Sequence, residues 1–143
     1  VVQDFYGQIA KRGSNYELTV EELQNAPLET NFKREMIAQR KGEYKKDDRW
    51  LIDFDLLTCM QTDMPTSAKA LPAKITGTSA SVPLKLSYLS GVRRKPGVEA
   101  LNIHLQQTGE GWQIDNVYYS RPALVRKDAL SFIQWAKEES AKK

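Results

Sequence analysis

The sequence is poor in the residues on which much catalytic chemistry depends, with one cysteine and one histidine among 143 residues. With Cys59 alone, the chain forms neither an internal disulfide nor a metal site built from several cysteines. Any hydrolase chemistry that requires a histidine must use His104. The sequence also lacks a phosphate-binding glycine loop, a zinc-ligand spacing and an apolar run long enough to cross a bilayer. We therefore expect no metal, no cofactor and no membrane span.

A strong charge of one sign is missing as well. The chain has 21 basic and 18 acidic residues, a formal net charge of +3, and both signs are spread along it. Its densest basic run, Arg93-Arg94-Lys95, stands beside Pro96-Gly97, a composition typical of exposed turns. We expect a solvated hairpin tip there and no nucleic-acid partner. The alternative, a phosphate-contacting patch, predicts strongly salt-dependent binding.

The length and composition fit one folded domain covering residues 1–143. Hydrophobic residues make up 41% and charged residues 27% of the chain, as in ordinary globular proteins. No segment repeats another, so no internal boundary is expected. The sequence begins at Val1 without a methionine, which is compatible with a removed signal peptide or lipid anchor.

Helical spacing of apolar residues occurs at both ends of the chain. Residues 1–42 carry such stripes, and Thr19 and Glu22 stand in capping-box positions at the start of a short helix. Pro27 separates that helix from the next. Residues 122–140 contain the C-terminal helix, whose predicted buried stripe consists of Ala129, Phe132, Ile133 and Ala136.

Residues 50–120 are mostly strands, and period-two alternation is clearest in three successive segments. The first has Val82, Leu84, Leu86 and Tyr88 on one face, the second has Leu101, Ile103 and Leu105, and the third is residues 111–119. Short turns between them predict an antiparallel meander. Gly77 favours a bend before it, and Pro83 favours an edge or irregular position. Helices, then strands, then a helix predict an α+β fold with helices on one face of a curved antiparallel sheet.

The third strand contains the polar pair Asp115-Asn116 between apolar residues. This region has two interpretations. In one, Asp115, Tyr118 and Tyr119 are catalytic residues, and in the other, the polar pair forms a β-bulge. We favour the bulge, because it places Trp112, Ile114, Val117 and Tyr119 on the face that meets the helices.

Residues 50–60 are strongly apolar but carry Asp53 and Asp55, which share a face if the chain is extended. We expect a short strand or an irregular packed segment. Residues 61–67 have the composition of a loop, and the charged residues 41–49 that of a solvated connector. A hard cation at Asp53, Asp55 and Asp63 is an alternative, but capping and solvent exposure are favoured, since a calcium loop needs more oxygens and a turn glycine.

This order of elements, with Gly-Trp-Gln-Ile-Asp-Asn-Val at 111–117, resembles the nuclear transport factor 2-like superfamily, whose cystatin-like cone is a curved sheet around N-terminal helices. Residues 53–63 look like the aspartate-rich segment of a family of uncharacterised bacterial secreted proteins and lipoproteins. That family usually has aspartate directly after glutamine, whereas Thr62 separates Gln61 from Asp63 here. The resemblance implies export to the periplasm or cell surface and exposed sheet faces that often form homodimers, and it brings no known reaction.

The sequence contains no catalytic constellation, and we interpret His104 as an outward-facing strand residue and Cys59 as a small buried thiol. This favours a non-catalytic extracytoplasmic bacterial domain, of accessory or immunity type, that binds a protein partner or small ligand. The predicted binding residues are Asp53, Asp55, Trp112, Asp115, Tyr118 and Tyr119. The alternative is a ligand-binding or ketosteroid isomerase-like enzyme in which Asp115, Tyr118 or His104 handles a proton inside the cone.

Overall fold

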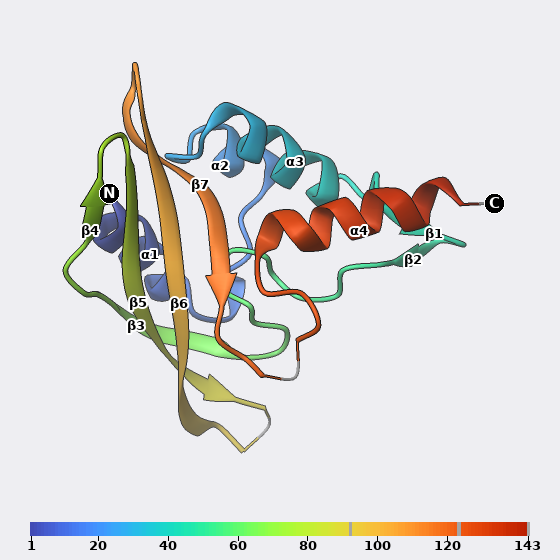
Figure 1. Cartoon of the computed structure of the whole chain (residues 1–143). Helices are drawn as coiled ribbons and strands as arrows, with labels where there is room; N and C mark the ends of the chain where they lie inside the picture. Colours follow the sequence, from blue (N-terminus) through green and yellow to red (C-terminus); the bar gives the residue numbers. More distant parts are fainter. Residues whose placement is uncertain (92, 123, 143) are drawn as a thin grey trace.

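The computed structural model describes residues 1–91, 93–122 and 124–142 and shows an α+β architecture (Figure 1). In chain order its elements are α1 (Val2–Lys11), a 3-10 turn (Gly13–Asn15), α2 (Val20–Gln24), α3 (Thr30–Arg40), β1 (Lys45–Lys46), β2 (Arg49–Trp50), β3 (Met64–Ala70), β4 (Lys74–Thr76), β5 (Ser79–Ser90), β6 (Lys95–Thr108), β7 (Gly111–Tyr119) and α4 (Ala129–Ala141). The predicted helix–strand–helix order is therefore confirmed.

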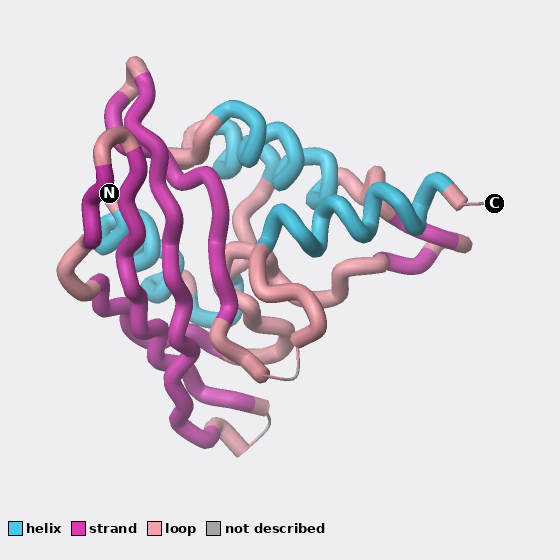
Figure 2. Tube along the Cα trace, in the orientation of Figure 1, coloured by secondary structure: helices cyan, strands magenta, loops and turns pink. Residues whose placement is uncertain are grey.

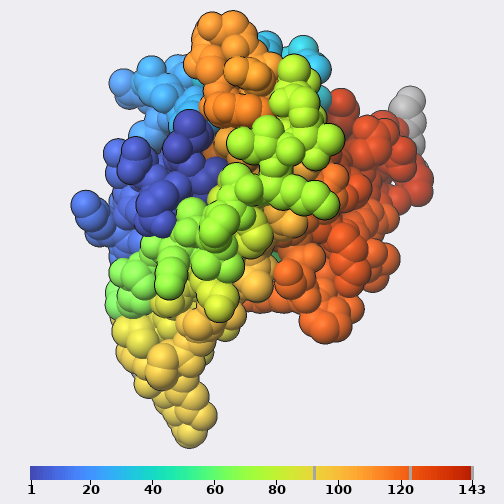
Figure 3. Space-filling view, turned by 60° about the vertical axis from the view of Figure 1, so that its left-hand side comes forward, coloured from blue at the N-terminus to red at the C-terminus, as the bar shows by residue number. Residues whose placement is uncertain are grey.

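The main sheet has the strand order β3-β5-β6-β7, with β4 also pairing with β5, and every pairing is antiparallel. Strands β5, β6 and β7 form the predicted meander. The sheet is twisted and curved, and the helices lie on one of its faces (Figures 1 and 2). The hairpin of β5 and β6 projects beyond the rest of the molecule (Figure 3). Its tip carries Arg93, Arg94 and Lys95, which are exposed as predicted.

The core forms where alternate strand residues meet the helical stripes. On β5 and β6 the predicted apolar faces are buried, including Leu84, Leu86 and Ile103, except that Tyr88 is only half-buried. The buried residues of α4 are the four in the predicted stripe, Ala129, Phe132, Ile133 and Ala136. Helix α4 begins at Ala129, because the carboxylate of Asp128 accepts a hydrogen bond from Ser131 N and caps the helix there. The predicted helical range 122–140 therefore begins too early.

The predicted β-bulge is present in β7. His104 pairs with Asn116 and Leu105 pairs with Ile114, so Asp115 is the extra residue. Ile114 and Val117 are both fully buried, whereas Trp112 is partly buried against the same core. Residues before and after the bulge thereby face the helices, as expected.

Both edges of the sheet are occupied by other parts of the chain. At β7, Ile114 N donates to Pro27 O (2.8 Å), and Tyr119 N donates to Lys127 O (2.7 Å). At β3, the side-chain amide of Gln3 donates to Ala68 O (2.9 Å) and accepts from Ala70 N (2.7 Å). The amide of a helix residue thus takes the place of a neighbouring strand at that edge.

The bulge residue Asn116 joins the sheet to α4. Its side-chain oxygen accepts from Leu130 N (3.1 Å), and its side-chain nitrogen donates to Asp128 Oδ2 (2.9 Å). Asn116 is buried, so these bonds also satisfy polar atoms that water does not reach freely. The polar pair at the centre of β7 therefore has a structural role.

Two sequence predictions about strands need correction. Residues 61–67 are not wholly a loop, because β3 begins at Met64. Residues 41–49 are not only a solvated connector, because β1 and β2 form a hairpin whose two turn residues, Asp47 and Asp48, have φ of 52° and 60°. Positive φ at both turn positions is the geometry that suits a two-residue hairpin.

Pro83 lies inside the sheet on β5, at an irregular position, which was one of the two expected positions. It stands opposite the interruption between β3 and β4, where its carbonyl accepts from Leu71 N (2.8 Å). The missing N–H of proline is tolerated there, because the regular ladder is already broken. Gly77, with φ of 62°, makes the turn between β4 and β5, as expected.

Candidate functional site

A pocket of about 360 Å³ lies between the α2–α3 hairpin and residues 50–57. Its volume falls in the range of small-molecule sites. Buried apolar side chains form part of its wall, namely Leu18, Leu23, Met36, Ile52 and Leu57. Polar side chains also line it, namely Glu17, Gln39, Arg40, Asp53 and Asp55. The pocket thus combines an apolar wall with several charged groups.

Residues 51–63 are irregular and packed rather than a strand, which was one of the two expected forms. A tight turn holds Asp55, since Asp55 N donates to Met60 O (2.8 Å) and Cys59 N donates to Asp55 O (2.7 Å). Two buried tyrosines fix the backbone within this turn. Tyr119 donates to Leu56 O (2.6 Å) and Tyr6 donates to Leu57 O (2.7 Å).

Asp55 is the most perturbed carboxylate of the pocket. Burial raises its pKa to about 6, and the nearby Glu17 carboxylate acts in the same direction. The hydroxyl of Thr58, which donates to Asp55 Oδ2 (2.6 Å), opposes this rise. Within the described part of the chain no cationic side chain forms an ion pair with Asp55. Asp53 is exposed, as predicted, whereas Asp55 and Asp63 are half-buried.

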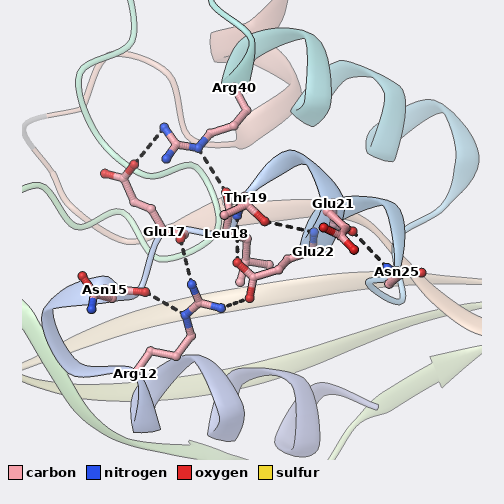
Figure 4. A network of polar contacts seen from close by, with 9 residues as sticks. All are labelled: Arg12, Asn15, Glu17, Leu18, Thr19, Glu21, Glu22, Asn25 and Arg40. Carbon is pink, nitrogen blue, oxygen red and sulfur yellow. Dashed lines mark hydrogen bonds and ion pairs between the residues drawn. The ribbon is translucent and has the colours of Figure 1, made fainter.

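Arg40 is the cationic residue of the pocket lining, and its guanidinium already has partners within the protein (Figure 4). Its guanidinium lies 3.2 Å from the Glu17 carboxylate and donates through Nε to Leu18 O (3.0 Å). A second ion pair, between Arg12 and Glu22, continues this network toward the capping box of α2, where Thr19 accepts from Glu22 N. These contacts hold the linker before α2 against the end of α3 and so shape one side of the pocket.

The structure separates the six predicted binding residues. Asp53 and Asp55 line the pocket, whereas Asp63 lies outside it. Tyr119 is buried and its hydroxyl donates to Leu56 O, so this side chain offers no accessible polar group to a ligand. Trp112 lines a different hollow, of about 290 Å³, that is apolar except for Gln3.

Asp115 and Tyr118 lie on the sheet face opposite the helices. Nδ1 of His104 is 3.0 Å from Asp115 Oδ1, and the rings of His104 and Tyr118 are 6.0 Å apart between centroids. Tyr118 is 42% exposed. The three residues named in the enzyme alternative are therefore neighbours, but they gather outside the helix-covered face rather than within it.

Cys59 is a small buried thiol, as predicted, and His104 lies on the outer side of β6 beside Asp115, also as predicted. Cys59 is buried in the core, and burial raises the pKa of its thiol to about 12. A thiol held protonated in this way is a poor nucleophile. Among the described residues, no group of three or more histidine, cysteine or acidic side chains is placed to hold a metal ion. In the same residues, no helix is both long and apolar enough to span a membrane.

Sequence reasoning missed the parts of the pocket that come from outside residues 50–60. The sequence assigns no binding role to four residues of the lining, namely Glu17, Gln39, Arg40 and Trp50. No spacing joins these positions in the sequence. Only the packing of the α2–α3 hairpin against residues 50–57 brings them together.

Comparison with known proteins adds no relative. No family model, no curated protein and no solved structure matches the chain.

Proposed function

We propose that this protein is a non-catalytic binding domain whose site is the pocket between α2, α3 and residues 50–57. The observation that carries the proposal is the pocket itself, about 360 Å³ in volume and lined by both apolar walls and the two predicted carboxylates, Asp53 and Asp55. Concave sites of this size with a few polar groups are the usual form of small-ligand sites. A small ligand is preferred here over a protein partner.

The proposal includes the nuclear transport factor 2-like fold and a location outside the cytoplasm, in the periplasm or at the cell surface. In support of the fold are the curved antiparallel sheet, its bulge at Asp115 and the helices on one face. The location rests on the resemblance of residues 53–63 to exported bacterial proteins. An accessory or immunity-type role, and a homodimer through the open sheet face, belong to the same proposal.

A screen of a chemically mixed small-molecule library tests this function. We expect compounds that bind the wild-type protein, observed by ligand NMR, to lose binding to Gln39→Trp, which fills the pocket from its half-buried rim. Gln134→Trp, at an exposed position on α4, is the matched control and retains binding. A library without any binder, or binders that Gln39→Trp leaves unaffected, would contradict the proposal.

A catalytic use of the same pocket is the second candidate. One observation favours it, since a carboxylate whose pKa lies at about 6 suits a general base near neutral pH. Against it, the hydroxyls of Tyr6 and Tyr119 are bonded to backbone carbonyls and do not face a ligand. Compounds recovered unchanged, without deuterium exchange from heavy water, support binding alone, and exchange that Asp55→Asn abolishes supports catalysis.

A further inference from the structure

We propose that the pocket between α2, α3 and residues 50–57 binds a small organic cation, with an ammonium group at Asp53 and Asp55 and an apolar body against the wall. This inference rests on the proposed function, because it names the ligand class of the same site. Three features carry it: the charge of the lining, the apolar wall and the contact of the Trp50 ring with an ammonium group.

The charged lining is unbalanced. Three carboxylates, those of Glu17, Asp53 and Asp55, face one guanidinium, that of Arg40. Arg40 is paired with Glu17 and also bonded to Leu18 O, so its positive charge is already used. Neither Asp53 nor Asp55 has an ion-pair partner within the part of the chain that the structure describes. A cationic ligand supplies the missing partner, whereas an anionic one meets repulsion.

The apolar wall restricts the ligand further. Leu18, Met36 and Leu57 are all at least nine-tenths buried and line the pocket. A hydrated inorganic ion would leave this surface unused, while the hydrocarbon part of an amine covers it. The described residues also provide no cluster of three metal-ligating side chains. The lining therefore fits an organic cation.

The Trp50 ring at the rim already holds an ammonium group, that of Lys45. The Nζ atom of Lys45 lies 4.4 Å from the centroid of the Trp50 ring, in cation–π geometry. Trp50 is 44% exposed and lines the pocket. Lys45 pairs with this ring and not with either aspartate, so the carboxylates stay open to a ligand.

Asp55 makes binding sensitive to pH. The titratable groups that act on it or feel its charge come from several elements, and they are Glu17, Tyr6, Tyr16, Cys59 and Tyr119. The tyrosines and the thiol stay neutral near pH 7, because burial raises the pKa of each of them. The carboxylates of Glu17, Asp53 and Asp55 then supply the negative charge that favours a cation, and protonation of Asp55 removes part of it.

Calorimetric titration with phenethylamine, phenethyl alcohol and phenylacetate tests the inference, since the three share an aromatic body and differ in charge. We expect the amine to bind, the alcohol to bind about tenfold more weakly and the carboxylate not to bind measurably. Asp55→Asn and the exposed Asp53→Asn should each weaken amine binding about tenfold or less and leave the alcohol unchanged. Asp4→Asn, at an exposed position on α1, is the control and should change nothing.

The pH dependence gives a second measurement. Amine affinity should fall as the pH is lowered through about 6, because Asp55 becomes protonated while the amine stays charged, and Asp55→Asn should flatten this profile. An alcohol that binds as tightly as the amine, a preference for the carboxylate, or no binding of any probe overturns the organic-cation inference. If a neutral or anionic probe binds the wild-type protein but not Gln39→Trp, the pocket is still the binding site and only the proposed ligand class is wrong.

Discussion

At the scale of single residues, Asp55 is the clearest case of a side chain that reduces stability. The pKa of its carboxyl is raised by burial to about 6, so the folded state favours the neutral form. Above that pH the folded protein holds a charge that the unfolded chain hydrates more easily. Native proteins keep such costs mainly where a site requires them, which agrees with a ligand-binding carboxylate.

Asp55→Asn should therefore stabilise the protein above about pH 7, by on the order of 2 kcal/mol. The sign follows from the raised pKa: the folded state binds the extra proton, so wild-type stability falls as pH rises from about 4 to about 6. Urea unfolding across this range measures the effect. Asp53→Asn, at an exposed position two residues away, is the control. A destabilised Asp55→Asn at high pH would show that the carboxylate is a net structural contributor.

At the scale of secondary-structure elements, the attachment of α4 depends on one residue of β7. Asn116 accepts from Leu130 N and donates to the Asp128 carboxylate, which itself caps the helix. The bulge turns this side chain toward the helix start. Helix α4 in turn covers Tyr119 through Phe132, whose ring centroid lies 6.0 Å from that of the tyrosine.

Asn116→Ala should destabilise the protein by about 1–3 kcal/mol, because it removes the side-chain oxygen that accepts from the buried Val117 N and from Leu130 N. In the Asn116→Ala variant, hydrogen exchange should show faster opening of α4 than of β5 and β6. Asn102→Ala, at an exposed position on β6, is the matched control and should cost little. Equal exchange of α4 in the two variants would mean that its apolar stripe alone holds the helix.

The elements with clear periodicity could be predicted, and those without it could not. Strands β5, β6 and β7 alternate, and the stripe of α4 is regular, so their buried faces follow from spacing. Strand β3 has small residues, such as Ser67 and Ala68, and no alternation, so its place depends on pairing with β5. Of the residues that line the pocket, Asp53 and Asp55 could be predicted from the sequence as binding residues. Glu17 and Arg40 could not, because only tertiary packing brings them there.

At the scale of the whole molecule, the sheet leaves one face open and has parts of its edges covered. Exposed strand edges pair readily with other chains, and proteins commonly cover them. Here the segment around Pro27 and the residues before α4 cover β7, while the Gln3 amide bonds to β3. These contacts leave fewer free edge groups for self-association.

Gln3→Ala should increase concentration-dependent association, because it frees Ala68 O and Ala70 N at the edge of β3. Sedimentation velocity over a concentration series measures this. Thr19→Ala is a suitable control, since loss of the α2 cap costs about 1 kcal/mol without exposing a strand edge. Similar association of both variants would assign the effect to lower stability rather than to the freed edge.

The buried thiol has a practical consequence for experiments on this protein. Cys59 is the only cysteine of the chain, it is 2% exposed, and its pKa of about 12 leaves almost no thiolate at neutral pH. A maleimide dye or spin label should therefore leave the native protein unmodified. A cysteine introduced at the pocket rim or on the open sheet face can then be labelled selectively, with the wild-type background intact.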